Sequence, residues 1–120
     1  MRRRSLIVAI AAFLLAVGVS LSAHHSFYAT YREDEQITLQ GTLDRVVYRN
    51  PHSYVYLQVS ERDHQTRLWV VECGSPDQMR RQRLTIETLK PGDRLIVTGS
   101  PGRDPGDRRL RLRTIARPAA

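Results

Sequence analysis

The sequence is poor in the residues on which several common protein classes depend. It has one cysteine and one lysine among 120 residues, and it contains no Cys-x-x-Cys pair, His-Glu-x-x-His pattern, glycine-rich phosphate loop or Ser/His/Asp signature. One cysteine cannot form an internal disulfide, and a chain of this length has room for one small domain. These absences exclude a disulfide scaffold and a pair of domains, and they give no support to a hydrolase or a nucleotide-dependent enzyme.

Long apolar runs are absent except near the start of the chain. Arg2–Arg4 precede the apolar stretch Leu6–Val19, and small residues follow as far as Ala23. This is the layout of a secretory signal, and the run is shorter than the about 20 residues that cross a membrane. We expect a signal peptide over residues 1–23, cut after Ala23 or after Ser22, and a mature protein that is periplasmic or secreted and has no membrane span. An uncleaved N-terminal anchor is the alternative.

The mature chain alternates apolar and polar residues in short segments, which is typical of β-strands. Gly41 interrupts the first segment and predicts a bulge or a sharp bend, and Asn50-Pro51 predicts a turn. Ser75 and Pro76 can start a short helix. Strands are predicted over residues 36–50, 53–60, 67–73, 94–99 and 109–115, a helix over Asp77–Arg83, and a second helical turn over Thr85–Leu89.

The predicted element order, β-β-β-α-β-β, is that of an OB-type barrel. We therefore expect a mainly β protein with a small five-stranded OB-like barrel over residues 36–117. An N-terminal segment, residues 24–35, would precede the barrel, and a tail over residues 118–120 would follow it.

Two of the four histidines, His24 and His25, lie at the predicted cleavage point. Cleavage after Ala23 gives His24 a free amine, which can chelate a metal together with its own Nδ1. A second imidazole, for which His52 ranks first, would complete the three-nitrogen arrangement called a histidine brace, and such a set suits Cu(II). Cleavage after Ser22 places His25 third in the mature chain, which also permits copper chelation. The alternative is solvated terminal histidines with no metal.

Three further side chains bear on this hypothesis. Trp69, Val71 and Cys73 would share one face of a strand, so Cys73 is expected to be buried and inert. Glu72 would point to the other face, where it could hold a ligating histidine or be solvated or salt-bridged. Tyr54 is a second candidate for such a supporting contact.

The cations are concentrated in arginine clusters. Loss of Arg2–Arg4 with the signal would lower the formal net charge from +7 to +4. On the last predicted strand, Arg109, Arg111 and Arg113 alternate with leucines, so one face is cationic. In an exported protein this face would meet anionic lipid headgroups or envelope polymers rather than nucleic acid. The alternative is a charged edge strand that resists aggregation.

Several segments together resemble a family of small exported bacterial proteins, domain of unknown function 6152. They are AHHSF at Ala23–Phe27, GT at Gly41-Thr42, NPH at Asn50–His52, GSP at Gly74–Pro76 and TLKPGD at Thr88–Asp93. The family's Trp-x-x-Glu segment resembles Trp69–Glu72, and the aromatic residue after NPH corresponds to Tyr54, which lies one residue later than is usual in the family. The chain departs from the pattern at Cys73, where an aliphatic residue is usual, and in the helix segment MRRQRLT, which lacks a tryptophan. The resemblance implies export, an OB-like barrel and the constellation of His24, His25 and His52, and it names no reaction.

The sequence thus favours an exported binding protein that carries or senses copper, with His24, His52 and His25 as ligands. Redox catalysis on the same brace is less well supported, because no substrate groove is recognisable in the sequence. The alternative function is a metal-free interaction module that binds a periplasmic protein or an envelope anion through its arginine-rich strand. Salt would weaken such charge-driven binding, whereas low pH would weaken chelation by nitrogen ligands.

Overall fold

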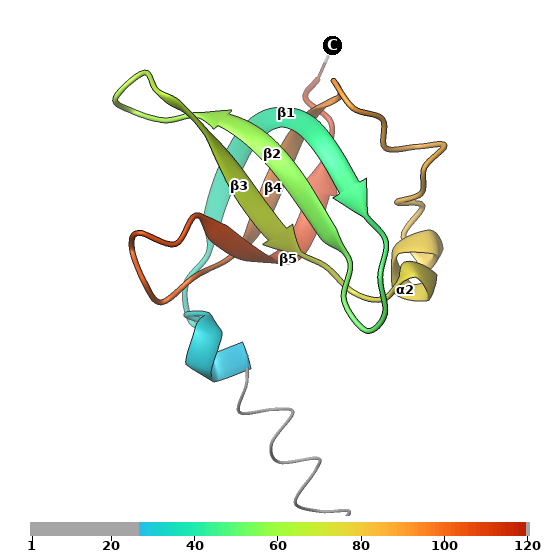
Figure 1. Ribbon diagram of the computed structural model, residues 1–120, viewed down its shortest axis with the longest axis horizontal. Helices are drawn as coiled ribbons and strands as arrows, with labels where there is room; N and C mark the ends of the chain where they lie inside the picture. The colour runs from blue at the N-terminus through green and yellow to red at the C-terminus, as the bar shows by residue number, and fades with distance from the viewer. Residues whose placement is uncertain (1–26, 120) are drawn as a thin grey trace, which may run out of the picture. The chain divides into compact units, whose positions relative to one another are not determined.

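The computed structural model describes residues 27–119 (Figure 1). Residues 27–30 are helical and belong to a compact unit that ends at Thr30, and the barrel unit begins at Tyr31. Its elements are β1 (Ile37–Val47), β2 (Tyr54–Ser60), β3 (Thr66–Glu72), α2 (Pro76–Arg81), β4 (Arg94–Pro101) and β5 (Arg109–Ala116). In residues 27–119 no helix has both the length and the apolar character needed to cross a bilayer. The predicted signal peptide lies outside the described residues.

The five strands form a closed barrel in the order β1-β2-β3-β5-β4. Strand β3 pairs in parallel with β5, all other neighbours are antiparallel, and pairing of β1 with β4 closes the barrel. The predicted mainly β, OB-like barrel is confirmed. The arginine-rich strand β5 pairs with β4 and, over residues 109–111, also with β3, so its interpretation as an edge strand is wrong. In Figure 1, α2 and the β1–β2 loop lie at one end of the barrel, and the β2–β3 hairpin lies at the other.

Strand β1 is long because it pairs with two different strands along its length. Its residues 37–42 pair with β4 and its residues 42–47 pair with β2, so that Thr42 takes part in both ladders. The bend brings Gly41 against β2, where a Cβ would lie 2.7 Å from the carbonyl oxygen of Gln58, which explains the glycine. The bulge itself lies three residues further on, between Leu43 and Arg45. Before Gly41 the two strands diverge.

The strand ends differ from the sequence predictions by a few residues. Strand β4 continues to Pro101 because Ser100 and Pro101 still pair with β5. Helix α2 begins where expected, with Ser75 and Gln78 in a capping box. It ends at Arg81, two residues early, because Arg83 adopts a left-handed conformation with φ of 59°. The predicted turn over Thr85–Leu89 is a single turn, closed by a 2.8 Å hydrogen bond from Leu89 N to Thr85 O.

The core fills the inside of the barrel and its α2 end. Val71 and Cys73 are buried there and Trp69 is partly buried against them, as the strand pattern predicts. Burial raises the pKa of the Cys73 thiol to about 12, so the thiol stays protonated and unreactive. The buried core residues are Leu43, Val55, Leu57, Val59, Val71, Cys73, Met79, Leu89, Leu95, Val97 and Leu110.

Candidate functional site

Glu72, the last residue of β3, receives hydrogen bonds on both carboxylate oxygens. Its side chain is 12% exposed, and its Oε1 lies 2.7 Å from Nδ1 of His52. Its Oε2 accepts a hydrogen bond from the hydroxyl of Tyr31. Because an ionised carboxylate only accepts hydrogen bonds, Nδ1 of His52 carries a proton. In the neutral imidazole this leaves the lone pair on Nε2, the nitrogen with which His52 can bind a metal.

The register between β2 and β3 explains why His52 reaches Glu72. Tyr54 lies directly opposite Glu72 in the ladder, and His52 precedes Tyr54 by two residues, so all three lie on one side. The ladder continues past the strand ends through Ser53, whose carbonyl oxygen accepts from Cys73 N at 2.8 Å and whose N donates to Gly74 O at 2.9 Å. His52 is therefore held in position by backbone pairing of its neighbour.

Tyr31 is the site residue that the sequence does not indicate. It lies in the N-terminal segment, is 1% exposed and forms an isolated bridge with Gly102. Burial, together with the Glu72 carboxylate, raises the pKa of Tyr31 far above its ordinary value. Its hydroxyl therefore stays protonated and remains a donor to Glu72. The guanidinium of Arg109 lies 5.5 Å from the centre of the Tyr31 ring.

The other two predicted ligands, His24 and His25, lie outside the described residues. Within residues 27–119 no group of three or more His, Cys, Asp or Glu side chains could hold a metal ion. At this site the described part of the chain supplies one imidazole, that of His52, supported by Glu72. The other described histidine, His64, lies in the β2–β3 loop. Tyr54 shares their side of the sheet, and the guanidinium of Arg49 lies 5.8 Å from its ring centre.

The arginines of β5 form ion pairs within the protein. Glu33, 17% exposed, lies 2.8 Å from Arg111, and its carbonyl oxygen accepts a 2.9 Å hydrogen bond from Arg113. Arg109 lies 3.8 Å from Asp107. A small pocket of about 200 Å³ beside these groups is lined by Glu33, Ser100, Arg111, Leu112 and Arg113. The acidic Glu33 therefore already occupies part of the cationic face proposed for an anion.

Comparison with known proteins agrees with the segments noted in the sequence. No curated protein matches the chain. The profile of a family of unknown function, DUF6152, matches residues 11–110, which include His52, Glu72 and Tyr31. The chain therefore belongs to the DUF6152 family, as its His-His, Asn-Pro-His and Lys-Pro-Gly-Asp segments indicate.

Proposed function

We propose that this protein is exported and binds copper through its processed N-terminus together with His52. One observation supports this most strongly: Nδ1 of His52 lies 2.7 Å from the Glu72 carboxylate, which is itself held by Tyr31. Metal-binding histidines commonly donate their second ring nitrogen to a carboxylate, because this selects the tautomer, orients the ring and makes the ligating nitrogen more basic.

The proposed ligands are three nitrogens. His24 supplies its amine and Nδ1, His52 supplies Nε2, and His25 is an alternative ligand or a neighbour that orients the site. Imidazole and amine nitrogens in a tetragonal arrangement suit Cu(II), which also has the highest affinity in the divalent series.

The proposed terminal ligands are close in sequence to a residue that is held beside His52. Tyr31 follows His25 by six residues, and its hydroxyl donates a hydrogen bond to Glu72, which contacts His52. The role is binding, carriage or sensing of copper in the periplasm or outside the cell.

A copper titration of the exported and processed protein tests the proposal, with the N-terminus confirmed by intact mass. We expect one-to-one binding that weakens about tenfold or more in His24→Ala, in His52→Ala and in a form whose N-terminal amine is acetylated, because each change removes a nitrogen ligand. The matched control is His64→Ala, which removes an imidazole from the β2–β3 loop and should leave the affinity unchanged.

Equal affinity of the wild type and His52→Ala would overturn the assignment of His52. No binding beyond that of the acetylated form would overturn the N-terminal site. The metal-free interaction module would then remain, although the pairing of Arg111 and Arg113 with Glu33 does not favour it.

A further inference from the structure

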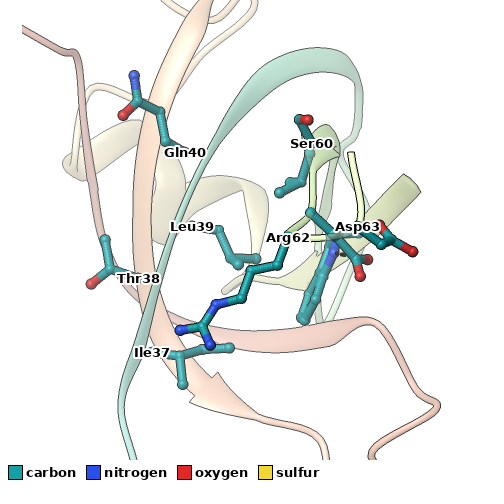
Figure 2. A pocket seen from close by; sticks show the side chains of 10 residues that line it. Ile37, Thr38, Leu39, Gln40, Ser60, Arg62 and Asp63 are labelled. Atoms are coloured by element: carbon teal, nitrogen blue, oxygen red, sulfur yellow. Dashed lines mark hydrogen bonds between the residues drawn. The ribbon is translucent and has the colours of Figure 1, made fainter. Parts of the chain in front are cut away.

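A groove opens where β1 diverges from β2. The first half of β1 pairs with β4 alone, while β2 continues into its hairpin with β3. The space between them has a volume of about 670 Å³ (Figure 2), within the range of about 300–1,000 Å³ that is usual for small-molecule sites. Its apolar lining comes from Ile37, Leu39, Val59 and Trp69, and none of the residues of the His52–Glu72 pair lines it.

The two acidic side chains at the groove are already neutralised. Glu61 accepts hydrogen bonds from Arg108 at 2.5 Å and from the Trp69 indole at 3.2 Å. Asp63 lies 2.7 Å from Arg67, and its hydrogen bonds from Arg67 and from the backbone of Gln65 lower its pKa to about 2. Both carboxylates therefore stay ionised and bound to cations, and they would not repel an anionic ligand strongly.

Arg62 is the cation of this groove that forms no ion pair among the described residues. It is exposed, and no carboxylate among residues 27–119 pairs with it. In Figure 2 its side chain extends across the groove toward Ile37, with Leu39 beside its path and Asp63 pointing away. The groove thus combines an apolar floor with one available guanidinium at its mouth.

We propose that this groove binds a small amphipathic carboxylate, such as a medium-chain fatty acid. The carboxylate would accept paired hydrogen bonds from the Arg62 guanidinium, whose planar geometry matches it. The apolar chain would lie on Ile37, Leu39 and Trp69, and burial of this chain would supply much of the affinity. A polyanion such as a nucleic acid is a poor fit, because its backbone needs several available cations along its path.

The position of Trp69 provides a direct measurement, because it is the only tryptophan in the chain and it lines the groove. Octanoate is titrated into the protein with a metal chelator present, and Trp69 fluorescence is recorded. We expect a saturable change, with octanoate binding about tenfold or more tightly than octanol because only octanoate carries the charge. The chelator makes the result independent of copper binding.

Two variants separate the role of Arg62 from general charge effects. Arg62→Gln should bring the affinity for octanoate down to that for octanol. Arg81→Gln removes an exposed arginine of α2 outside the groove and should change neither affinity. Circular dichroism confirms that both variants are folded. No saturable change with octanoate, equal binding of octanoate and octanol to the wild type, or unchanged octanoate binding by Arg62→Gln would each overturn the proposal.

Discussion

Two glutamates lie near opposite ends of β3. Each accepts hydrogen bonds from more than one side chain, but the donors differ in kind. Glu61, in the loop before β3, is surrounded by the guanidinium groups of Arg108 and Arg67 and by the Trp69 indole. Glu72, at the end of β3, is bound by an imidazole and a phenol. Arginine stays charged at every ordinary pH, so the Glu61 cluster is a permanent ionic contact. The Glu72 cluster instead ends in an imidazole, which can bind a metal.

The difference assigns different roles to the two ends of the strand. Hydrogen bonding from Arg108 is the main cause that lowers the pKa of Glu61, and this keeps the carboxylate ionised and the hairpin attached to β5. At Glu72 the carboxylate uses one oxygen to fix His52 and the other to fix Tyr31. On the proposed function, the Glu72 cluster positions a copper ligand, whereas the Glu61 cluster is a structural contact.

The largest expected effect comes from neutralising Glu72, with Glu61 neutralised for comparison. Glu72→Gln should lower copper affinity by about 10- to 100-fold, because the imidazole of His52 loses the carboxylate that orients it. Glu61→Gln is the matched control and should leave copper affinity unchanged. Competitive copper titration measures both. An equal loss in the two variants would show that the effect comes from the barrel as a whole and would remove the distinction between the clusters.

Tyr31→Phe should give a smaller effect, on stability. Removal of the hydroxyl leaves Oε2 of the largely buried Glu72 without its donor, and we expect the free energy of unfolding to fall by about 1–2 kcal/mol. Urea denaturation followed by circular dichroism measures the change. Tyr56→Phe serves as the control, because it keeps the ring on which Arg45 packs at 3.9 Å. Equal stability of Tyr31→Phe and the wild type would mean that the Tyr31–Glu72 contact is not an anchor.

The smallest effect is expected at acid pH, in the hairpin beside Glu61. The pKa of Asp63 is lowered from 3.8 to about 2 by Arg67 and by the Gln65 backbone. A carboxylate with a lowered pKa stabilises the folded state above its ordinary pKa, and this contribution is lost as the pH falls from about 4 to about 2. Asp63→Asn should therefore flatten this part of the stability profile, as measured by urea denaturation from pH 7 to pH 2. A profile unchanged by the substitution would contradict the role of this ion pair.

The site was accessible to sequence reasoning only in part. His52 could be named because it follows the Asn50-Pro51 turn, and Glu72 because alternation along a strand separates it from Val71 and Cys73. Nothing local to Tyr31 indicates that its hydroxyl meets Glu72, since the two residues are 41 positions apart in the chain. The sequence also did not give the position of the bulge in β1. The bulge lies after Gly41, close to the point where β1 stops pairing with β4 and pairs with β2.

The sequence by itself determined the number, order and approximate bounds of the strands and the start of α2. These features are local, because the alternation of side chains, the turn residues and the helix cap act within a few residues. Only the tertiary structure decided that β5 is paired on both sides, that Glu33 meets its arginines, that Arg62 stands over an apolar groove, and that Tyr31 and His52 share the carboxylate of Glu72. Closure of the barrel brings these residues together although they are far apart in the sequence. Local sequence patterns act within a few residues and therefore do not predict such contacts.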